Sequence, residues 1–306
     1  MIWILAGIIP PFLWSVVNHL DKYLLSKNHE KSSVDVLITY STLFSLILLP
    51  FLYWFGRHEL IIDLRQVIIQ IAGGLLFAVS IYFYLKALFK DETSIVMPFV
   101  LLVPVFGYFF SYIILGEVLS FVQIIYCALI LLGALILSIE IKEEIKFKLN
   151  HGVFFLMVIS TSLQAMQETL FKFATINNSF VVSLFWLHIG IALCGIFLVI
   201  FKKHLFKHFI ESVRLRGTGM LTINAFSELV VAVADAIRNY ALLLAPVVVV
   251  MTFNSFQPAF VFIIGTILTI IAPKFVKEKI RPIHLIHKAL AIAIMVTGAI
   301  LIANTI

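Results

Sequence analysis

Long, continuous apolar runs make up most of the chain, and they limit how it can fold more than any other feature. A helix that crosses the hydrocarbon core of a bilayer needs about 20 mostly apolar residues, and these runs reach that length. Strands of a membrane barrel would alternate between polar and apolar residues over about ten positions, and the runs do not. The sequence therefore predicts an all-α integral membrane protein with ten transmembrane helices. The expected spans are 2–26, 34–55, 65–88, 94–115, 120–139, 151–173, 180–201, 217–242, 246–271 and 284–303.

The composition supports lipid as the main solvent of the folded chain. Of its 306 residues, 62% are hydrophobic and 12% are charged, whereas soluble domains carry about 25% charged residues. The net charge of +6 lies mostly between the apolar runs, where basic residues contact headgroups or set topology, so it does not indicate nucleic-acid binding. Cys127 and Cys194 lie inside apolar runs, and we expect buried thiols there, not a disulfide.

The two halves of the chain carry short matches in the same order. Gly133 near the end of the fifth span corresponds to Gly298 near the end of the tenth, and Pro104 corresponds to Pro258. Further matches pair Tyr84 with Tyr240, and Asn18-x-x-x-Lys22 with Glu168-x-x-x-Lys172. Five spans per half is an odd number, so the second copy must insert upside down, as in many transporters. We therefore expect a first five-helix repeat at 1–140, a charged linker at 141–150 and a second, inverted five-helix repeat at 151–306.

Ionisable residues inside the spans are the best indicators of function, because each costs about 2.5–3.5 kcal/mol at mid-bilayer. Span 217–242 carries Glu228 and Asp235, which share a helix face, and Arg238 lies within pairing reach of Asp235. Two interpretations stay open. Either Glu228 faces a cavity and binds a proton or a cationic group, or Asp235 and Arg238 form a structural ion pair while Glu228 bonds to a neighbouring helix.

Two other spans carry polar stripes at a spacing of four residues. Gln164, Glu168 and Lys172 form one stripe in the sixth span, where Glu168 and Lys172 can pair. Trp14 and Asn18 lie on a stripe of the first span. Trp14 could stack on an aromatic ring or face a cation, or it could equally be a packing residue. Glu168 is accordingly a second candidate for a cavity residue.

The candidate site follows from these polar groups. The predicted solute-binding residues are Trp14, Asn18, His19, Tyr82, Gln164, Glu168, Glu228, Asn254 and Gln257, and the candidates for proton or cation coupling are Glu228, Glu168 and Asp235. We expect no cofactor and no metal, because the histidines at His204-x-x-x-His208 and His284-x-x-His287 lack the paired boxes of di-iron enzymes and are better interpreted as a headgroup-contacting rim. The expected partners are a small-molecule substrate and the lipid bilayer, with no nucleic acid, and the expected state is a monomer or weak homodimer.

A further pattern lies between the third and fifth spans. It runs from Tyr84-Leu85-Lys86-Ala87-Leu88 through Ser94, Pro98 and Pro104 to Leu115-Gly116-Glu117-Val118-Leu119, with Gly133 beyond it, and the stretch from Trp14 to Lys22 fits the same pattern. This resembles the EamA-type branch of the drug/metabolite transporter superfamily. The second half departs from it, because Ala272-Pro273-Lys274 stands where the family often repeats a Gly-Glu turn. The resemblance implies a ten-helix carrier of small metabolites with a central cavity lined mainly by helices one, three, four, six, eight and nine.

We therefore expect a secondary transporter working by alternating access, with proton coupling an open possibility, in a bacterial inner membrane. A cationic or zwitterionic solute, such as an amine or amino acid, would suit carboxylates near an aromatic ring. The competing function is a polytopic membrane enzyme for lipid or acyl substrates, which would need a metal or catalytic dyad near a headgroup layer. Orientation is open as well. All but four of the 22 Lys and Arg residues lie on the side opposite the termini, which favours termini outside, while the family resemblance favours termini inside.

Overall fold

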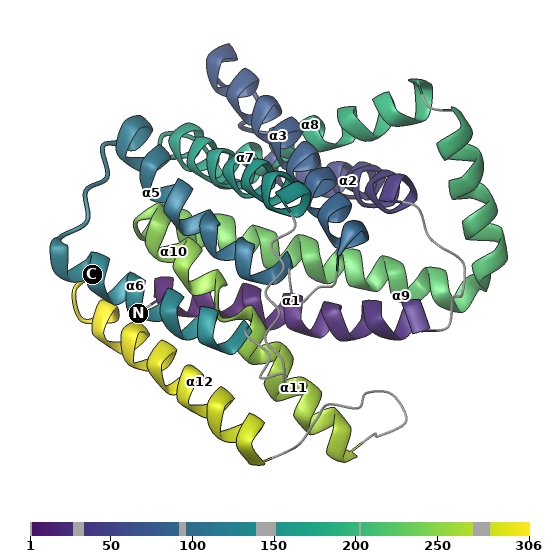
Figure 1. Ribbon diagram of the computed structural model, residues 1–306. Helices are drawn as coiled ribbons and strands as arrows, with labels where there is room; N and C mark the ends of the chain where they lie inside the picture. The colour runs from purple at the N-terminus through teal and green to yellow at the C-terminus, as the bar shows by residue number, and fades with distance from the viewer. Residues whose placement is uncertain (1, 27–33, 92–95, 139–150, 202, 272–281) are drawn as a thin grey trace.

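The computed structural model describes residues 2–26, 34–91, 96–138, 151–201, 203–271 and 282–306, with side chains described there except at 21–26, 34–37, 203–221 and 282–284. Every regular element in these ranges is a helix (Figure 1). In chain order they are α1 (Ile2–Ser26), α2 (Val34–Gly56), α3 (Leu64–Lys90), η1 (Met97–Leu101), α5 (Leu102–Leu115), α6 (Phe121–Ser138), α7 (His151–Thr175), α8 (Phe180–Phe201), α9 (Lys203–Leu244), α10 (Val247–Asn254), α11 (Gln257–Ile271) and α12 (Pro282–Ala303). The predicted all-α membrane class is confirmed. The linker 141–150 lies outside the described residues, as does Ala272-Pro273-Lys274.

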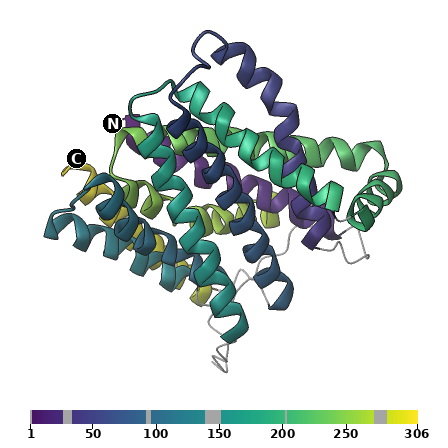
Figure 2. The same cartoon turned by 90° about the horizontal axis from the view of Figure 1, so that it is seen from above.

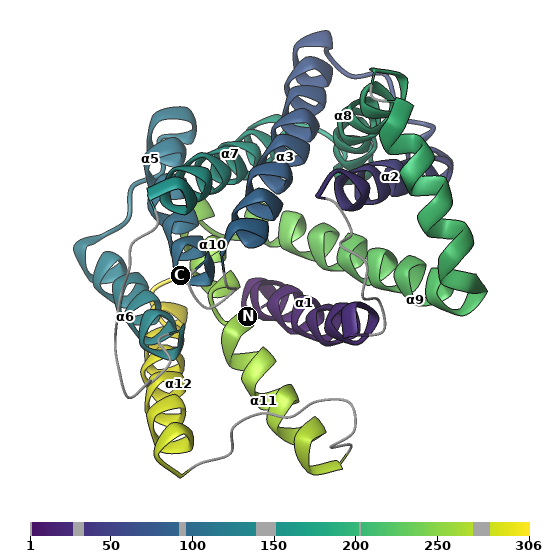
Figure 3. The ribbon, with the colours of Figure 1, turned by 45° about the vertical axis from the view of Figure 1, so that its right-hand side comes forward.

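Nine segments within the described ranges are long and apolar enough to cross a membrane. The remaining predicted span, 217–242, belongs to α9, a helix of 42 residues. Its described part carries Glu228, Asp235 and Arg238 within a few turns, which makes it more polar than the other spans. Figure 1 and Figure 3 show the first part of α9 turned away from the rest of this helix.

Two predicted spans are each divided into two helical segments. Span 94–115 consists of the 3-10 segment η1 followed by α5, and span 246–271 consists of α10 followed by α11. Pro104 lies in the first turn of α5 and Pro258 in the first turn of α11. A proline there is tolerated because the first turn of a helix needs no intrahelical N–H donor. The prolines thus begin new helices after a break.

Helices from residues 2–138 pack mainly on helices from residues 151–303. The most extensive pairs are α3 with both α7 and α8, α1 with α9, α2 with α8, α6 with α12, and α5 with α7. Figure 2, viewed from above, shows this interleaving of purple and blue helices with green and yellow ones. The two halves therefore share one bundle and do not form separate bodies.

Glycines allow the closest of these contacts. A Cβ on Gly74 of α3 would overlap the carbonyl oxygen of Leu187 on α8, and a Cβ on Gly190 would overlap the carbonyl oxygen of Ile71. Gly195 likewise faces the Thr42 hydroxyl, at 2.8 Å from its ideal Cβ position. The glycines of α3 and α8 therefore lie at close helix contacts.

Where α6 meets α12, each helix carries a glycine that packs against the other helix. Gly133 of α6 packs against Ala291 and Met295, while Gly298 of α12 packs against Tyr126 and Ile130. The later residue of α6 thus contacts the earlier residues of α12, and the later residue of α12 contacts the earlier residues of α6. The two helices are therefore antiparallel. Both chain termini lie near these helices at one end of the bundle (Figure 1). We call this end, which also holds the α5–α6, α7–α8 and α9–α10 turns, the N-terminal face.

Candidate functional site

An ion-pair network lies inside the bundle, between α7 and α9. Arg238 Nη1 of α9 is 3.1 Å from Glu168 Oε1 of α7, and Arg238 Nη2 is 3.7 Å from Asp235 Oδ1, one helical turn earlier on α9. Arg238 is 3% exposed, Glu168 is fully buried and the Asp235 side chain is 18% exposed. One cation thus serves two carboxylates, and the network carries a formal charge of −1 when all three groups are ionised. We call these three residues the polar centre.

Two side chains predicted from the sequence surround the polar centre. Gln164, one turn before Glu168 on α7, donates from Nε2 to Glu168 Oε1 at 3.2 Å. Trp14 of α1 lies beside the Asp235 carboxylate, and the Arg238 Cζ atom lies 5.5 Å from the centre of its ring. The cation–π contact expected for Trp14 is therefore made to Arg238 of the protein itself. Helices α1, α7 and α9 thus converge on the polar centre.

The polar centre has buried hydrogen-bonding capacity left over. Within the described residues, Glu168 Oε2, Arg238 Nε and both side-chain polar atoms of Gln167 have no hydrogen-bond partner, and neither has Asn239 Oδ1. Because an unmade hydrogen bond on a buried polar group costs about 1–3 kcal/mol, such groups are usually satisfied. Their concentration around Arg238 leaves donors and acceptors that a water molecule or another polar group could satisfy.

A small void of about 20 Å³ adjoins these groups on the α8 side. A space of this size holds about one water molecule. Its lining combines apolar side chains of α3 and α8 with polar side chains of α7, α8 and α9, namely Phe77, Gln167, Leu187, His188, Ile191, Asp235, Arg238 and Asn239. The polar centre is therefore enclosed, with no room for a metabolite in this conformation.

Glu228 lies apart from the polar centre. Ser41 of α2 donates to Glu228 Oε1 at 2.7 Å, and the ten residues between Glu228 and Arg238 correspond to about 15 Å along a helix. The structure therefore has the second geometry that the sequence left open, in which Asp235 pairs with Arg238 and Glu228 bonds to a neighbouring helix. Sequence reasoning gave Glu228 the leading role, whereas the buried ion pairs gather around Glu168.

The other predicted residues lie at different levels of the bundle. His19 is buried on α1, and its Nε2 donates to the Val261 carbonyl oxygen of α11 at 3.1 Å, so it ties two helices together. Tyr82 is half-buried on α3, where its ring meets the Lys86 ammonium at 4.4 Å. Asn18 on α1 is also half-buried.

Asn254 and Gln257 flank the break between α10 and α11. Asn254 is the last residue of α10, Gln257 is the first of α11, and both are half-buried. The Asn254 side-chain amide makes no hydrogen bond within the described residues. A broken helix with an unused amide at the break is a common element of solute sites in transporters.

Lys172 does not pair with Glu168, contrary to the i,i+4 pair expected from the sequence. Its Nζ atom lies 2.6 Å from Glu117 Oε1 and donates to the Ala245 carbonyl oxygen at 2.7 Å. Glu117 Oε2 in turn accepts the backbone N–H of Val247 at 2.8 Å. Gly116, the left-handed C-cap of α5 (φ 68°), turns the chain so that Glu117 can reach across. Lys172 therefore does not compete with Arg238 for Glu168.

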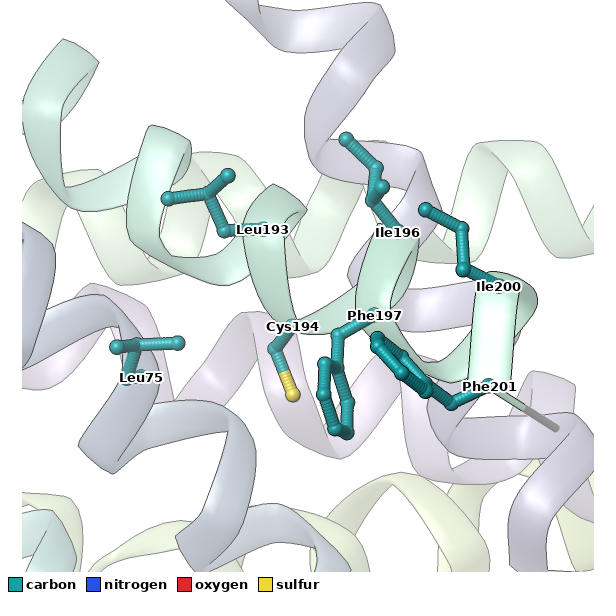
Figure 4. A pocket seen from close by; sticks show the side chains of 7 residues that line it. All are labelled: Leu75, Leu193, Cys194, Ile196, Phe197, Ile200 and Phe201. Carbon is teal, nitrogen blue, oxygen red and sulfur yellow. The ribbon is translucent and has the colours of Figure 1, made fainter.

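A larger hollow than the void beside Arg238 lies elsewhere. A cavity of about 430 Å³ is lined by Leu75 of α3 and, on α8, by Leu193, Cys194, Ile196, Phe197, Ile200 and Phe201. Figure 4 shows that this lining is apolar apart from the Cys194 thiol. Phe197, Ile200 and Phe201 are more than half exposed on the side that would face lipid, so this cavity is a groove of the hydrocarbon-facing surface and not a polar site.

Sequence reasoning missed Gln167, Asn239 and Glu117 as site residues. Gln167 and Asn239 could have been found as polar residues inside apolar spans. Neither lies on the polar stripes at a spacing of four residues that the sequence analysis used. Within the described residues there is no group of three or more His, Cys, Asp or Glu side chains placed to hold a metal. The side chains of His204, His208 and His284 lie outside the described residues.

The chain resembles a transporter family in sequence and a solved structure in fold. Residues 1–139 match the model of the EamA-like transporter family. Among solved structures 27 chains match, and one titled "Crystal structure of protein" aligns over 98% of this chain and 95% of its own, with a TM-score of 0.70 and 17% sequence identity. At that identity the likeness shows the fold alone. No curated protein matches the chain.

The family match supports a role in membrane transport in general, and it supports a non-enzymatic protein over the competing membrane enzyme. It agrees with the apolar helices in making the chain an integral membrane protein. The resemblance seen in the sequence is confirmed: residues 1–139 match the model of the EamA-like transporter family, which is part of the drug/metabolite transporter superfamily.

Proposed function

We propose that the protein is a secondary transporter that carries a small cationic or zwitterionic solute by alternating access through the polar centre. The observation that carries this proposal is the buried Glu168–Arg238–Asp235 network between α7 and α9, inside a bundle of membrane-length helices. Charged groups are costly there and usually mark a substrate or ion pathway. A purely structural role would be served better by apolar packing of similar volume.

The charge of the polar centre supports the proposed solute class. With two carboxylates and one guanidinium, a proton or a positively charged group brings the formal charge to zero. Glu168 Oε2 offers an unused acceptor for it, while the indole of Trp14 lies beside Asp235 and Arg238. A solute ammonium would compete with Arg238 for these carboxylates. A proton on Glu168 would weaken its pairing with Arg238, and we propose that this competition couples solute movement to protons.

Alternating access is supported by the enclosure of the site. Solute sites usually measure about 300–1,000 Å³, whereas the void beside Arg238 measures about 20 Å³. A metabolite can reach Glu168 only if helices around it move. The breaks at η1–α5 and α10–α11 are suitable points for such movement, because broken helices line the sites of many carriers.

An inverted repeat, with its units at 1–140 and 151–306, would supply two equivalent states for this movement. The helix packing supports it, because the pairs α3·α7 and α1·α9 exchange under such a repeat, as do α5·α7 and α1·α11, while α2·α8 and α6·α12 map onto themselves. The contacts of Gly133 and Gly298 are likewise related by exchange of the halves. Both breaks, at Pro104 and Pro258, lie at corresponding places.

Transport can be tested with the purified protein in proteoliposomes. The solutes would be L-lysine, L-threonine and choline, with L-glutamate as an anionic comparison, each followed with and without a pH gradient. We expect uptake above that of protein-free liposomes for at least one of the first three, faster with the gradient. Failure of all three to enter, or selective uptake of L-glutamate, would contradict the proposed solute class, and an absent gradient effect would contradict proton coupling.

The expected location, a bacterial inner membrane, stays a proposal. Membrane fractionation of cells that express the protein would test it, with enrichment in the inner-membrane fraction as the expected result.

A further inference from the structure

The contacts of Glu117 and Lys172 tie together three parts of the N-terminal face. Glu117 belongs to the α5–α6 turn of the first half, Lys172 to the end of α7 in the second half, and Ala245 and Val247 to the α9–α10 turn. Both side chains are only slightly exposed, at 17% for Glu117 and 11% for Lys172. We call Glu117, Lys172 and the two backbone groups that they hold the clamp.

The clamp joins two helix ends of opposite polarity. Lys172 donates to the carbonyl oxygen of Ala245, just after α9, where the helix dipole favours a positive charge. Glu117 accepts the first N–H of α10, where the dipole favours a negative charge. Since Glu117 and Lys172 also pair with each other at 2.6 Å, the position of the α9–α10 turn depends on contact between the two halves.

The clamp lies directly above the polar centre. Lys172 is one helical turn beyond Glu168 on α7, and Ala245 is two turns beyond Arg238 on α9. Between these two levels lie Phe171 on α7 and Ala241 and Leu242 on α9, each at most 1% exposed, and we call these three residues the apolar layer. A solute that entered from the N-terminal face would have to pass both the clamp and this layer.

We propose that the Glu117–Lys172 clamp is the gate that closes the N-terminal face over the polar centre, and that it must open during each transport cycle. This inference rests on the proposed transport function and names two positioning residues for it. A pair near the membrane surface suits this role, because water can take over its hydrogen bonds when it opens. The Arg238–Glu168 pair is fully enclosed and lacks that option.

The gate can be tested by the accessibility of the apolar layer, without any transport measurement. The background is the full chain with Cys127→Ala and Cys194→Ala, and Ala241→Cys serves as the reporter because it replaces a small, fully buried side chain. A membrane-impermeant maleimide is applied to proteoliposomes from the side of the N-terminal face. In the otherwise unchanged protein we expect slow labelling.

Glu117→Gln and Lys172→Gln should each raise the labelling rate about tenfold or more, because each removes the charge-assisted contacts that hold the α9–α10 turn. Glu59→Gln is the matched control, since Glu59 is an exposed acid in the turn after α2, and it should leave the rate unchanged. Lys172→Arg keeps the charge and the donors, and we expect it to stay within about threefold of the unchanged protein.

Labelling of both Gln variants at the rate of the Glu59→Gln control would overturn the gate. Loss of the folded, monodisperse protein in both variants would overturn it as well, because the clamp would then serve stability. If labelling rises while no solute is transported, the gate stands and the transport proposal fails. If a solute is transported but labelling does not change, transport stands and the gate fails.

Discussion

Arg238→Gln is the substitution with the largest expected effect on stability. Arg238 is held by Glu168 Oε1 at 3.1 Å and by Asp235 Oδ1 at 3.7 Å, and it contacts the ring of Trp14. Without Arg238, the carboxylates of Glu168 on α7 and Asp235 on α9 lose the cation that pairs with both of them. Glu168 is fully buried and cannot be hydrated in place, so much of the cost falls on this residue.

The magnitude follows from the burial of the pair. Removing one partner of a buried ion pair costs about 3–5 kcal/mol, and by the shifts typical of domains of 150–250 residues this corresponds to a fall in Tm of roughly 10 °C. Asp235→Asn should cost less than Glu168→Gln, because Asp235 is farther from Arg238 and partly exposed. Combining Arg238→Gln with Glu168→Gln should restore part of the loss, since no unpaired charge then stays on Glu168.

The assay is thermal unfolding in one detergent, followed by fluorescence, with Glu59→Gln as a surface control. Each variant is compared at the same pH and lipid content, because bound lipid also shifts Tm. Refutation would come from an Arg238→Gln protein that unfolds within about 2 °C of the parent. It would also come from a double variant in which the two losses simply add, because additivity means that the two groups do not interact.

Three further outcomes can be measured in the same way. Gly74→Val should lower Tm strongly or prevent folding, because its Cβ would overlap the Leu187 carbonyl oxygen. Gly116→Ala has open space around the new Cβ and should cost only about 1–2 kcal/mol of stability, because of the positive φ at this position. Equal losses of stability in the two variants would contradict the packing described. Gln167→Leu should leave Tm unchanged or raise it, because two unsatisfied buried atoms disappear, and it should lower solute uptake. A large loss of stability would mean that the Gln167 amide has a hydrogen-bond partner. Ser41→Ala should lower stability by up to about 2 kcal/mol, because Glu228 loses the hydrogen bond from Ser41, and it should leave uptake near that of the parent. Loss of uptake would indicate that Glu228 takes part in transport.

The helices were predictable from the sequence because lipid imposes a simple rule of length and apolarity. The limits of α1, α7 and α8 agree with the expected spans within two residues. The early start of α9 at Lys203 was not predictable in this way, since residues outside the hydrocarbon core need no apolar run to form a helix. For the breaks before α5 and α11, the sequence offered only Pro104 and Pro258. Whether a proline bends a helix or begins a new one depends on the packing around it.

The site was only partly predictable. Glu168, Asp235, Gln164 and Trp14 stood out as polar or aromatic residues on helix stripes, and the structure brings all four to Arg238. Which carboxylate pairs with which cation depends on how α7 and α9 are rotated, and helix rotation cannot be read from one stripe. For this reason Lys172 was assigned to Glu168, its neighbour on the same helix, when its partner comes from the other half of the chain.

The pairing of Glu117 illustrates the same limit. Gly116-Glu117 was noticeable as a family-like motif in a turn, but a turn residue can reach many partners. Only the three-dimensional arrangement shows that Glu117 contacts both Lys172 and the first N–H of α10. Long-range contacts of this kind leave no local periodicity in the sequence.

Stabilisation by solute tests most directly whether the polar centre binds what is transported. The measurement is the rise in Tm when the solute that gives the fastest uptake is added to the parent, to Glu168→Gln and to Glu59→Gln. Saturation at about 100 times Kd adds about 2.7 kcal/mol of stability, so we expect rises of roughly 5–10 °C in the parent and in Glu59→Gln, and none in Glu168→Gln. An equal rise in the folded Glu168→Gln protein would contradict binding at the polar centre.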